Sequence, residues 1–375
     1  MSDVNPLIVM AAGGTGGHMF PAQALAAELH SRNCRLVLIT DRRGDVWQGE
    51  EKGIETYRIR AGGIAGKNIF ARFKSSSELA IGTLQARKIL KRLSPMAVVG
   101  FGGYASIPTM LAASHSGFPT AIHEQNAVLG RANRLLAKRV SCIATSFKKT
   151  EGLPKGGTLQ VVHSGMPLRS AVSIVKECPY PSLRPDGNVS LLVIGGSQGA
   201  RIFSEVVPRG LGLLDDDLRS RIHVSQQCRP EDLERTSNLY REIGIDAELK
   251  TFFKDAPKRL ANSHLLIGRS GASTVAEALA IGCPAILVPY PHATDDHQTR
   301  NAHAVVEGGA GWLMPEESFT PTELSVRLTS LISSPVILEK SAIAARAAAT
   351  IDAEVHFADL VLNLIALSHN ESRAA

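Results

Sequence analysis

One stretch of the chain, Arg269 to Pro291, concentrates residues able to bind a charged ligand. A Ser-Gly pair followed by an apolar run predicts the start of a helix near Ser270, and the free N–H groups and positive dipole end of such a helix suit a diphosphate. Glu277 interrupts the apolar run and shares a helical face with Ser273 or Thr274. A carboxylate on so apolar a helix needs hydrogen-bond donors. The hydroxyls of a ribose would supply them; an arginine of the protein is the alternative.

A glycine turn near the beginning of the chain places a histidine where it could act as a base. The turn Gly13-Gly-Thr-Gly-Gly-His18 follows an apolar segment, and Pro21 is typical of the first turn of a helix. An imidazole at this junction could accept a hydroxyl proton near neutral pH. A helix-capping or buried histidine is the alternative. The turn departs from the GxGxxG spacing, so a nicotinamide cofactor is not favoured.

The second half of the chain opens with a similar turn, Gly195-Gly-Ser-Gln-Gly199. It also matches the GxSxG elbow of serine hydrolases, in which Ser197 would be the nucleophile and Asp296 and His297 its partners. That interpretation leaves the first half of the chain unexplained. A Ser197 hydroxyl that contacts a phosphate explains both halves, and is preferred.

The elements that must position these residues alternate between short strands and helices, which predicts parallel βαβ units. A polar segment, His123-Glu-Gln-Asn126, follows one of the strands, at the end where α/β sheets bind ligands; Asn126 could also cap the next helix. The predicted strands are 7–12, 35–40, 97–101, 120–123, 140–145, 159–163, 189–194, 222–225, 265–267 and 284–289.

The repeated strand–glycine–helix junctions predict an α/β protein of the GT-B type, with two Rossmann-like, doubly wound parallel-sheet domains facing a cleft. A chain of 375 residues fits two domains. The expected boundaries give an N-terminal domain at 1–164, a C-terminal domain at 165–340, and a helical end at 341–375 that packs back on the N-terminal domain.

Composition narrows the class of protein further. Apolar residues make up 44% of the chain, yet no apolar run reaches the roughly 18 residues of a membrane span. The beginning of the chain lacks a basic segment typical of a signal peptide. The five cysteines are scattered without a CxxC pair, which favours buried thiols in a reducing cytosol over disulfides or a metal site.

Six motifs in order along nearly the whole chain, GGTGGH, GFGGYASIP, HEQNA, GGSQGA, RSGASTVAEALAIGCPAILVPYP and DDHQTRNA, resemble those of the MurG-type N-acetylglucosaminyltransferases, which have the GT-B fold. The resemblance implies a hexosyltransferase of peptidoglycan synthesis. Such an enzyme moves N-acetylglucosamine (GlcNAc), with inversion, from UDP-GlcNAc to the C4 hydroxyl of the N-acetylmuramoyl group of lipid I, giving lipid II. Another GT-B UDP-sugar transferase is the alternative, and the serine hydrolase a more distant one.

The resemblance also implies roles for individual residues. His18 would be the general base. Glu277 would bind the ribose hydroxyls, and the backbone beside Phe253 would bind uracil. The remaining substrate contacts implied by the resemblance are Thr15, Gly16, Gly17, Asn126, Arg169, Ser197, Ala272, Ser273, Thr274, Val275, Ala276, His297 and Gln298. No cofactor and no metal are required, because helix N–H groups can neutralise the diphosphate.

A basic window predicts contact with an anionic membrane surface. Residues 58–92 contain nine basic residues and one acidic residue, a net charge of +8 in a chain whose total is +6. The resemblance places a peripheral membrane patch here, at the cytoplasmic face of the inner membrane; an ordinary solvated helix is the alternative. No nucleic-acid motif accompanies the charge. The expected patch residues are Lys67, Ile69, Phe70, Arg72, Phe73, Lys74 and Leu79.

Overall fold

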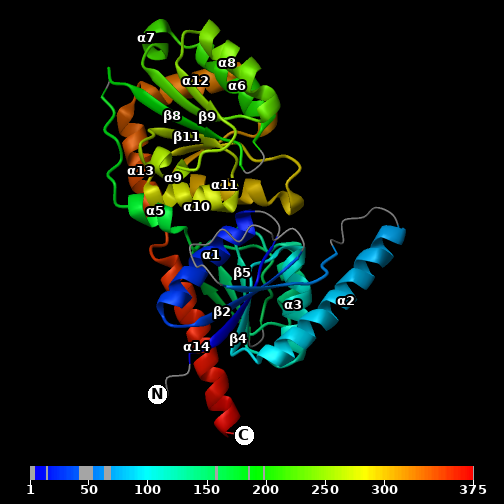
Figure 1. Cartoon of the computed structure of the whole chain (residues 1–375). Coiled ribbons are helices and arrows are strands. Elements are labelled where there is room, and N and C mark those ends of the chain that lie inside the picture. Colours follow the sequence, from blue (N-terminus) through cyan, green and yellow to red (C-terminus); the bar gives the residue numbers. More distant parts are fainter. Residues whose placement is uncertain are drawn as a thin grey trace. The chain divides into compact units, whose positions relative to one another are not determined.

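The computed structural model describes residues 5–13, 16–41, 54–62, 69–156, 159–184, 186–196 and 199–374, without the side chains of residues 16, 69–74, 369 and 371–374. The chain folds into two compact units (Figure 1). Unit 1 comprises Met1–Arg169 and Thr350–Ala375, and unit 2 comprises Ser170–Ala349.

Within its described residues, unit 1 is built on a seven-stranded parallel sheet in the order β3-β2-β1-β4-β5-β6-β7. The strands are β1 (Leu7–Ala11), β2 (Arg35–Thr40), β3 (Glu55–Arg58), β4 (Ala97–Gly100), β5 (Thr120–Glu124), β6 (Cys142–Thr145) and β7 (Gln160–His163). The helices are α1 (Gly16–Ser31), α2 (Ile69–Leu93), α3 (Gly103–His115), α4 (Arg131–Leu136) and α14 (Ala353–Ala374). The strand order reverses direction between β1 and β4.

Helices bury both faces of this sheet, which is why its central strands are continuous apolar runs. Side chains alternate along β1, so that Ile8 and Met10 belong to one core cluster and Val9 to the other. The first cluster is completed by α1 and by Phe357 and Val361 of α14. The second is completed by residues of α2 and α3.

Unit 2 has, within its described residues, a six-stranded parallel sheet in the order β10-β9-β8-β11-β12-β13. The strands are β8 (Val189–Ile194), β9 (Ile222–Gln227), β10 (Ala247–Lys250), β11 (Leu265–Gly268), β12 (Ala285–Leu287) and β13 (Gly311–Leu313). The helices are α5 (Ser170–Val175), α6 (Arg201–Gly212), α7 (Asp216–Arg219), α8 (Leu233–Glu242), α9 (Ala256–Ala261), α10 (Ala272–Ile281), α11 (His297–Glu307), α12 (Pro321–Ile332) and α13 (Pro335–Ala348), with 3-10 turns η1 (Pro230–Asp232), η2 (Thr294–Asp296) and η3 (Glu316–Ser318).

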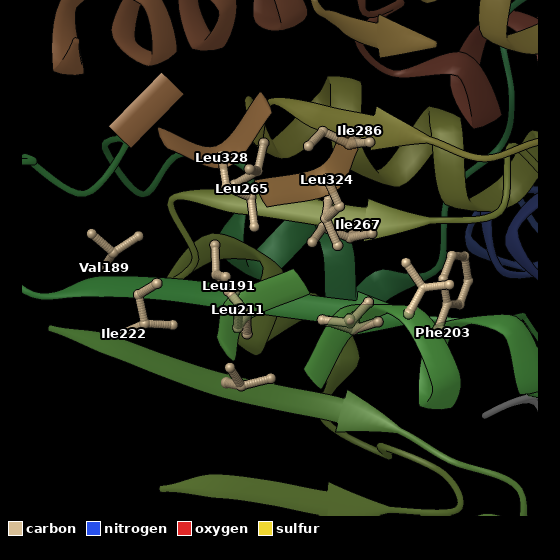
Figure 2. Close-up of a cluster of buried hydrophobic side chains, with 14 of the residues drawn as sticks. Val189, Leu191, Phe203, Leu211, Ile222, Leu265, Ile267, Ile286, Leu324 and Leu328 are labelled. Atoms are coloured by element: carbon tan, nitrogen blue, oxygen red, sulfur yellow. The ribbon is translucent and has the colours of Figure 1, made fainter. Parts of the chain in front are cut away.

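One hydrophobic cluster fills the core of unit 2 between its sheet and helices α6 and α12. Figure 2 shows Leu191, Leu265 and Ile286 of three neighbouring strands beside Leu324 and Leu328 of α12. Here the strand order reverses between β8 and β11. In open α/β sheets, ligands bind at the carboxyl ends of the strands beside such a reversal, so each unit has one expected binding edge.

The predicted strands agree with the structure in the centre of both sheets and at β7, and miss the other three edge strands of the described residues. The predictions 35–40 and 189–194 match β2 and β8 along their whole length. The unpredicted strands are β3, β10 and β13, each at the edge of a sheet and only three or four residues long. Polar residues make up most of β3 and half of β10, because a strand exposed at an edge does not need an apolar run.

The chain crosses between the units at other positions than the sequence suggested. It leaves unit 1 after Arg169 instead of residue 164, and returns at Thr350 instead of 341. The segment 341–375 is therefore not one helix of the first domain. Most of α13 lies in it and belongs to unit 2, where α13 packs on α10, whereas α14 packs on α1. The alanine-rich composition continues across both helices and hides the break at 349–352.

Candidate functional site

The glycine turns after β1 and β4 meet at the strand reversal of unit 1. Gly13 follows β1, and a Cβ atom there would lie 2.7 Å from the Cβ of Ala105 and 2.9 Å from the Oγ1 of Thr40. Gly102 and Gly103, which follow β4, have φ values of 78° and 69°, which side chains disfavour. These glycines bring the backbones of α1 and α3 close together.

His18 lies in the first turn of α1, against the second of these turns. Its Nδ1 is 2.8 Å from the carbonyl oxygen of Phe101, and a carbonyl can only accept. Nδ1 therefore carries the proton, and Nε2 carries the lone pair. A Cβ atom on Gly103 would lie 3.3 Å from Nε2, so the glycine leaves that atom room. A half-buried imidazole whose Nε2 carries the lone pair fits the chemistry of a general base.

Glu124, at the end of β5, organises the polar segment that follows this strand. Its buried carboxylate accepts four hydrogen bonds. Oε1 accepts from the backbone N of Asn126 at 3.0 Å and from its Nδ2 at 3.2 Å. Oε2 accepts from the N of Gly130 at 2.9 Å and from Nδ2 of Asn133 at 2.8 Å. Glu124 thus fixes the side chain of Asn126. The sequence pattern alone does not distinguish this role of Glu124 from the roles of its polar neighbours.

The surroundings of His123 indicate a structural role. It is fully buried, which lowers its pKa to about 4, and its Nε2 donates to the carbonyl oxygen of Gly165 at 3.0 Å. Its ring packs on Phe357 of α14 with 5.1 Å between centroids. Gln125 donates to the same Phe101 carbonyl that His18 uses, at 2.9 Å. Near neutral pH, His123 is a neutral support for this edge of the sheet.

Arg169, the last residue before the chain enters unit 2, lies against the helix that carries His18. Its guanidinium carbon is 4.4 Å from the ring centroid of Phe20 in α1. Thr15 and Lys67 lie outside the described residues. Gly16 and Gly17 are the first two residues of α1.

In unit 2, α10 begins at the strand reversal, directly after β11. Its N-cap is Gly271, which has no side chain to occupy the N–H groups of the first turn, and that turn contains no acidic residue. Within it, Ser273 and Thr274 are half-buried, as is Glu277 one turn later. The spacing of these three residues on one helix is therefore as predicted. Ala272 and Ala276 are also half-buried, whereas Val275 is buried in the core, so only its backbone could contact a ligand.

The first turns of α11 are tied to the start of α10. The Oγ of Ser270 donates to the carbonyl oxygen of Gln298 at 2.8 Å, and Nδ2 of Asn301 donates to the carbonyl of Ser270 at 3.0 Å. The Oε1 of Gln298 accepts from the N of Tyr290 at 2.9 Å. The structure therefore brings Gln298 to the same edge as α10. The hydroxyl of Ser270 already donates its hydrogen to the carbonyl oxygen of Gln298.

The predicted base contact, Phe253, follows β10 at the carboxyl edge of the same sheet. It is buried, with the guanidinium carbon of Arg259 4.3 Å from its ring centroid. Arg259 is in turn held by the carboxylates of Glu248 and Asp255. Sequence alone gave no signal for this support of the aromatic ring.

The geometry of residues 294–299 counts against the serine hydrolase. The Nδ1 of His297 is 2.8 Å from the carbonyl oxygen of Thr294, and Asp296 accepts from the Oγ1 of Thr299 at 2.6 Å. Asp296 and His297 do not form the acid–histidine pair that a triad needs. Ser197 lies outside the described residues. Among the described residues, no group of three or more His, Cys, Asp or Glu side chains is arranged to hold a metal ion.

The described part of α2 carries exposed basic and apolar side chains. Leu84 is 66% exposed and Ile81 38%, and Lys88 and Lys91 on the following turns are also exposed. Leu79 is half-buried. The predicted patch residues between Ile69 and Lys74 lie on α2, whose backbone alone is described there. None of the helices in the described ranges has the length and apolar composition to cross a membrane.

Comparisons with known proteins give one consistent result. Residues 8–145 match the glycosyltransferase family 28 N-terminal domain, and residues 190–356 match the family 28 C-terminal domain. A UDP-N-acetylglucosamine–N-acetylmuramyl-(pentapeptide) pyrophosphoryl-undecaprenol N-acetylglucosamine transferase of Paramagnetospirillum magneticum is 54% identical over 374 residues, covering 100% of both chains. The protein of the same name from Rhodospirillum rubrum is 54% identical over 94% of this chain and 91% of its own.

Solved structures agree with the sequence relatives. The crystal structure of Acinetobacter baumannii MurG has a TM-score of 0.77 and 30% identity, over 96% of this chain and 99% of the other. A putative UDP-N-acetylglucosamine 2-epimerase of Listeria monocytogenes has a TM-score of 0.67 at 13% identity, which shows a shared fold alone. The predicted α/β fold, with two parallel-sheet domains of the GT-B type, is confirmed.

Proposed function

This chain belongs to the MurG family of UDP-N-acetylglucosamine–N-acetylmuramyl-(pentapeptide) pyrophosphoryl-undecaprenol N-acetylglucosamine transferases, and we propose that it catalyses the transfer for which its relatives are named. It moves GlcNAc from UDP-GlcNAc to the C4 hydroxyl of the N-acetylmuramoyl group of lipid I, giving lipid II for peptidoglycan. The observation that carries the proposal is identity of 54% along the whole chain to a protein named for this transfer.

The donor binds on unit 2 in this proposal. Its diphosphate lies at the start of α10, where the first-turn N–H groups and the helix dipole favour negative charge and Gly271 leaves space. Glu277 accepts from the ribose hydroxyls, and the backbone beside Phe253 binds uracil. Gln298, and with it His297 and Ser197, lie near the sugar and phosphates. The diphosphate is neutralised by these N–H groups, so no metal or other cofactor is required.

The acceptor hydroxyl is deprotonated by His18 of unit 1. The hydroxyl oxygen attacks the anomeric carbon of GlcNAc while the bond from that carbon to the UDP oxygen breaks, which inverts the configuration. The proton passes to Nε2 of His18, and the negative charge passes to the leaving diphosphate. The Nδ1 bond to Phe101 supports this role, since it leaves Nε2 able to accept a proton. Asn126 and Arg169, with the turn at Thr15, Gly16 and Gly17, line the donor sugar.

A transfer assay tests the proposal. Radiolabelled UDP-GlcNAc incubated with lipid I and the protein should give label in butanol-extractable lipid. A His18→Ala variant should lose turnover by roughly a hundredfold or more while its affinity for UDP stays close to that of the wild type. Binding of UDP-GlcNAc without transfer to lipid would indicate a sensor, and ester hydrolysis without UDP binding would indicate a hydrolase. Either result would overturn the proposal.

The protein would act as a peripheral protein at the cytoplasmic face of the inner membrane. Exposed Leu84 and Ile81 beside Lys88 and Lys91 on α2 support this part of the proposal. Each cation close to an anionic surface contributes on the order of 1 kcal/mol, so a few cations with inserted apolar side chains give reversible attachment.

A vesicle sedimentation assay tests this membrane contact. A Lys88→Glu, Lys91→Glu variant should bind vesicles of anionic phospholipid at least about tenfold more weakly than the wild type. The control reverses two exposed charges of unit 2, Arg327→Glu with Lys340→Glu, and should bind like the wild type. Equal loss in both variants would show that only the net charge matters.

A further inference from the structure

Arg269 joins the carboxyl ends of three neighbouring strands of unit 2. It directly follows β11 and is only 8% exposed. One terminal nitrogen of its guanidinium donates to the carbonyl oxygens of Val288 at 3.2 Å and Pro289 at 3.0 Å, at the end of β12. The other terminal nitrogen pairs with the carboxylate of Glu316, just beyond β13. The side chain of Arg269 therefore links the carboxyl ends of β11, β12 and β13 to one another.

The guanidinium is fixed in place from two further sides. Its central carbon lies 5.4 Å from the ring centroid of Phe203 and 5.3 Å from that of Tyr290. Burying a charge is unfavourable unless it is paired and hydrogen-bonded, and here the carboxylate, two carbonyls and two rings meet that need. The planar fork of an arginine can bridge several acceptors at once, which the single ammonium of a lysine cannot do.

The same contacts determine how Gln298 is presented. The backbone N of Tyr290, adjacent to the carbonyl that Arg269 holds, lies 2.9 Å from Oε1 of Gln298. A backbone N–H can only donate, so the atom facing it must be the oxygen of the carboxamide. The amide nitrogen of Gln298 is left as the polar end of the side chain, with hydrogens to donate. Gln298 is thus set to recognise an acceptor atom.

The loop between Tyr290 and Gln298 is exposed or half-buried at every residue. A cavity of about 500 Å³ adjoins it, lined by Pro289, Pro291 and Thr299 together with residues of the β13 end. Asp295 and Asp296 have φ values of 53° and 52°, a region that costs non-glycine residues energy. The position of the loop therefore depends on its polar anchors, which are Arg269 at one end and Ser270 at the other.

We propose that Arg269 is a positioning residue for sugar recognition. By holding the carbonyls of Val288 and Pro289, it places the N–H of Tyr290 against Gln298, which then donates from its amide nitrogen to an oxygen of the donor sugar. The proposal rests on the proposed function, since it assumes a UDP-sugar on unit 2. Arg269 and Gln298 affect binding of the sugar, whereas α10 and the backbone beside Phe253 bind the nucleotide.

Two variants separate the positioning role of Arg269 from the hydrogen bond that Gln298 donates to the sugar. Arg269→Lys keeps the positive charge beside Glu316 but loses the fork, and Gln298→Glu keeps the size and the acceptor for Tyr290 but has no N–H to donate. For each variant, calorimetry gives the Kd for UDP, and kinetics give kcat/KM for UDP-GlcNAc, for its C4 epimer UDP-N-acetylgalactosamine and for UDP-glucose.

The expected result is a change in sugar recognition alone. In both variants kcat/KM for UDP-GlcNAc falls about tenfold, the value of one well-made hydrogen bond, and the preference over the two other sugars narrows. The Kd for UDP changes by less than about twofold in Arg269→Lys, which keeps the charge of the site. The matched control is Arg346→Lys, because Arg346 also caps carbonyls of unit 2, those of Lys176, Cys178 and Ile281, but contacts none of the loop. Its sugar preference should equal that of the wild type.

Three outcomes would overturn the proposal. One is a loss of UDP affinity in Arg269→Lys that matches its loss of UDP-GlcNAc turnover, since this would mean general damage to unit 2. The second is an altered sugar preference in the Arg346→Lys control. The third is an unchanged preference in Gln298→Glu, a variant that leaves the anchors of the loop intact and so decides the question even if Arg269→Lys does not fold. Failure of wild-type protein to bind UDP at all would instead refute the proposed function.

Discussion

Replacing Glu124 by glutamine should destabilise unit 1 far more than the loss of one charge suggests. The carboxylate accepts four N–H groups, two on each oxygen, from Asn126, Gly130 and Asn133. In Glu124→Gln one of the two oxygens becomes an NH2 group that faces two donors. Two hydrogen bonds to a buried carboxylate are lost, at about 1.5–3 kcal/mol each, so the free energy of unfolding should fall by about 3–6 kcal/mol.

Urea unfolding measures this difference, and hydrogen exchange assigns it to unit 1. The control is Glu28→Gln, the same chemical change at a more exposed carboxylate that pairs with Arg32 on the surface of α1. Surface pairs contribute about 0–1 kcal/mol, so the control should unfold close to the wild type. Faster exchange in Glu124→Gln should be concentrated in residues 124–136. Equal unfolding midpoints for the two variants would refute the assigned role of Glu124.

Other properties of the fold give further predictions. Burial lowers the pKa of His123 from 6.5 to about 4, so between these pH values the unfolded chain takes up a proton that the folded chain does not. The free energy of unfolding of unit 1 should therefore fall by about 3 kcal/mol as the pH drops from 6.5 to 4. Urea unfolding at several pH values measures this fall, which should be smaller in His123→Gln. Gly282 (φ 80°) and Gly244 (φ 71°) are both left-handed, but a Cβ on Gly282 would lie within 3 Å of three atoms of Arg346 and one on Gly244 would meet nothing. Gly282→Ala should therefore lower the thermal unfolding temperature clearly more than Gly244→Ala, which costs about 1 kcal/mol; equal shifts would contradict the packing of Arg346. Of the five cysteines only Cys178 is exposed, so one thiol should react rapidly with Ellman's reagent in the folded protein, and more than one fast thiol would argue against the structure.

The sequence was sufficient for the features that depend on local pattern. A buried parallel strand is a run of apolar residues, and a glycine turn before a helix is visible as such, so the central strands and the positions of His18 and α10 could be predicted. The assignments of His18 as a base and of Glu277 as a ribose ligand remain predictions, since they depend on contacts with the substrates.

Features that depend on distant residues could not be predicted. Phe101 is separated by 83 residues from His18, whose tautomer its carbonyl fixes. The support of Phe253 by Arg259, and the bridge from Arg269 to Glu316, likewise join separate elements of unit 2. A pattern search recognises the strand on which such a residue lies but carries no information on which partner folding will bring to it.

The return of the chain to unit 1 has a consequence for synthesis. The apolar face of the first sheet is covered partly by Phe357, Val361 and their neighbours in α14, which follow all of unit 2 in the sequence. As the protein emerges from the ribosome, residues 1–169 must wait with this surface uncovered until the whole of unit 2 has been translated. The nascent first unit is therefore the part most in need of protection from aggregation, and loss of the last two dozen residues would leave it permanently in that state.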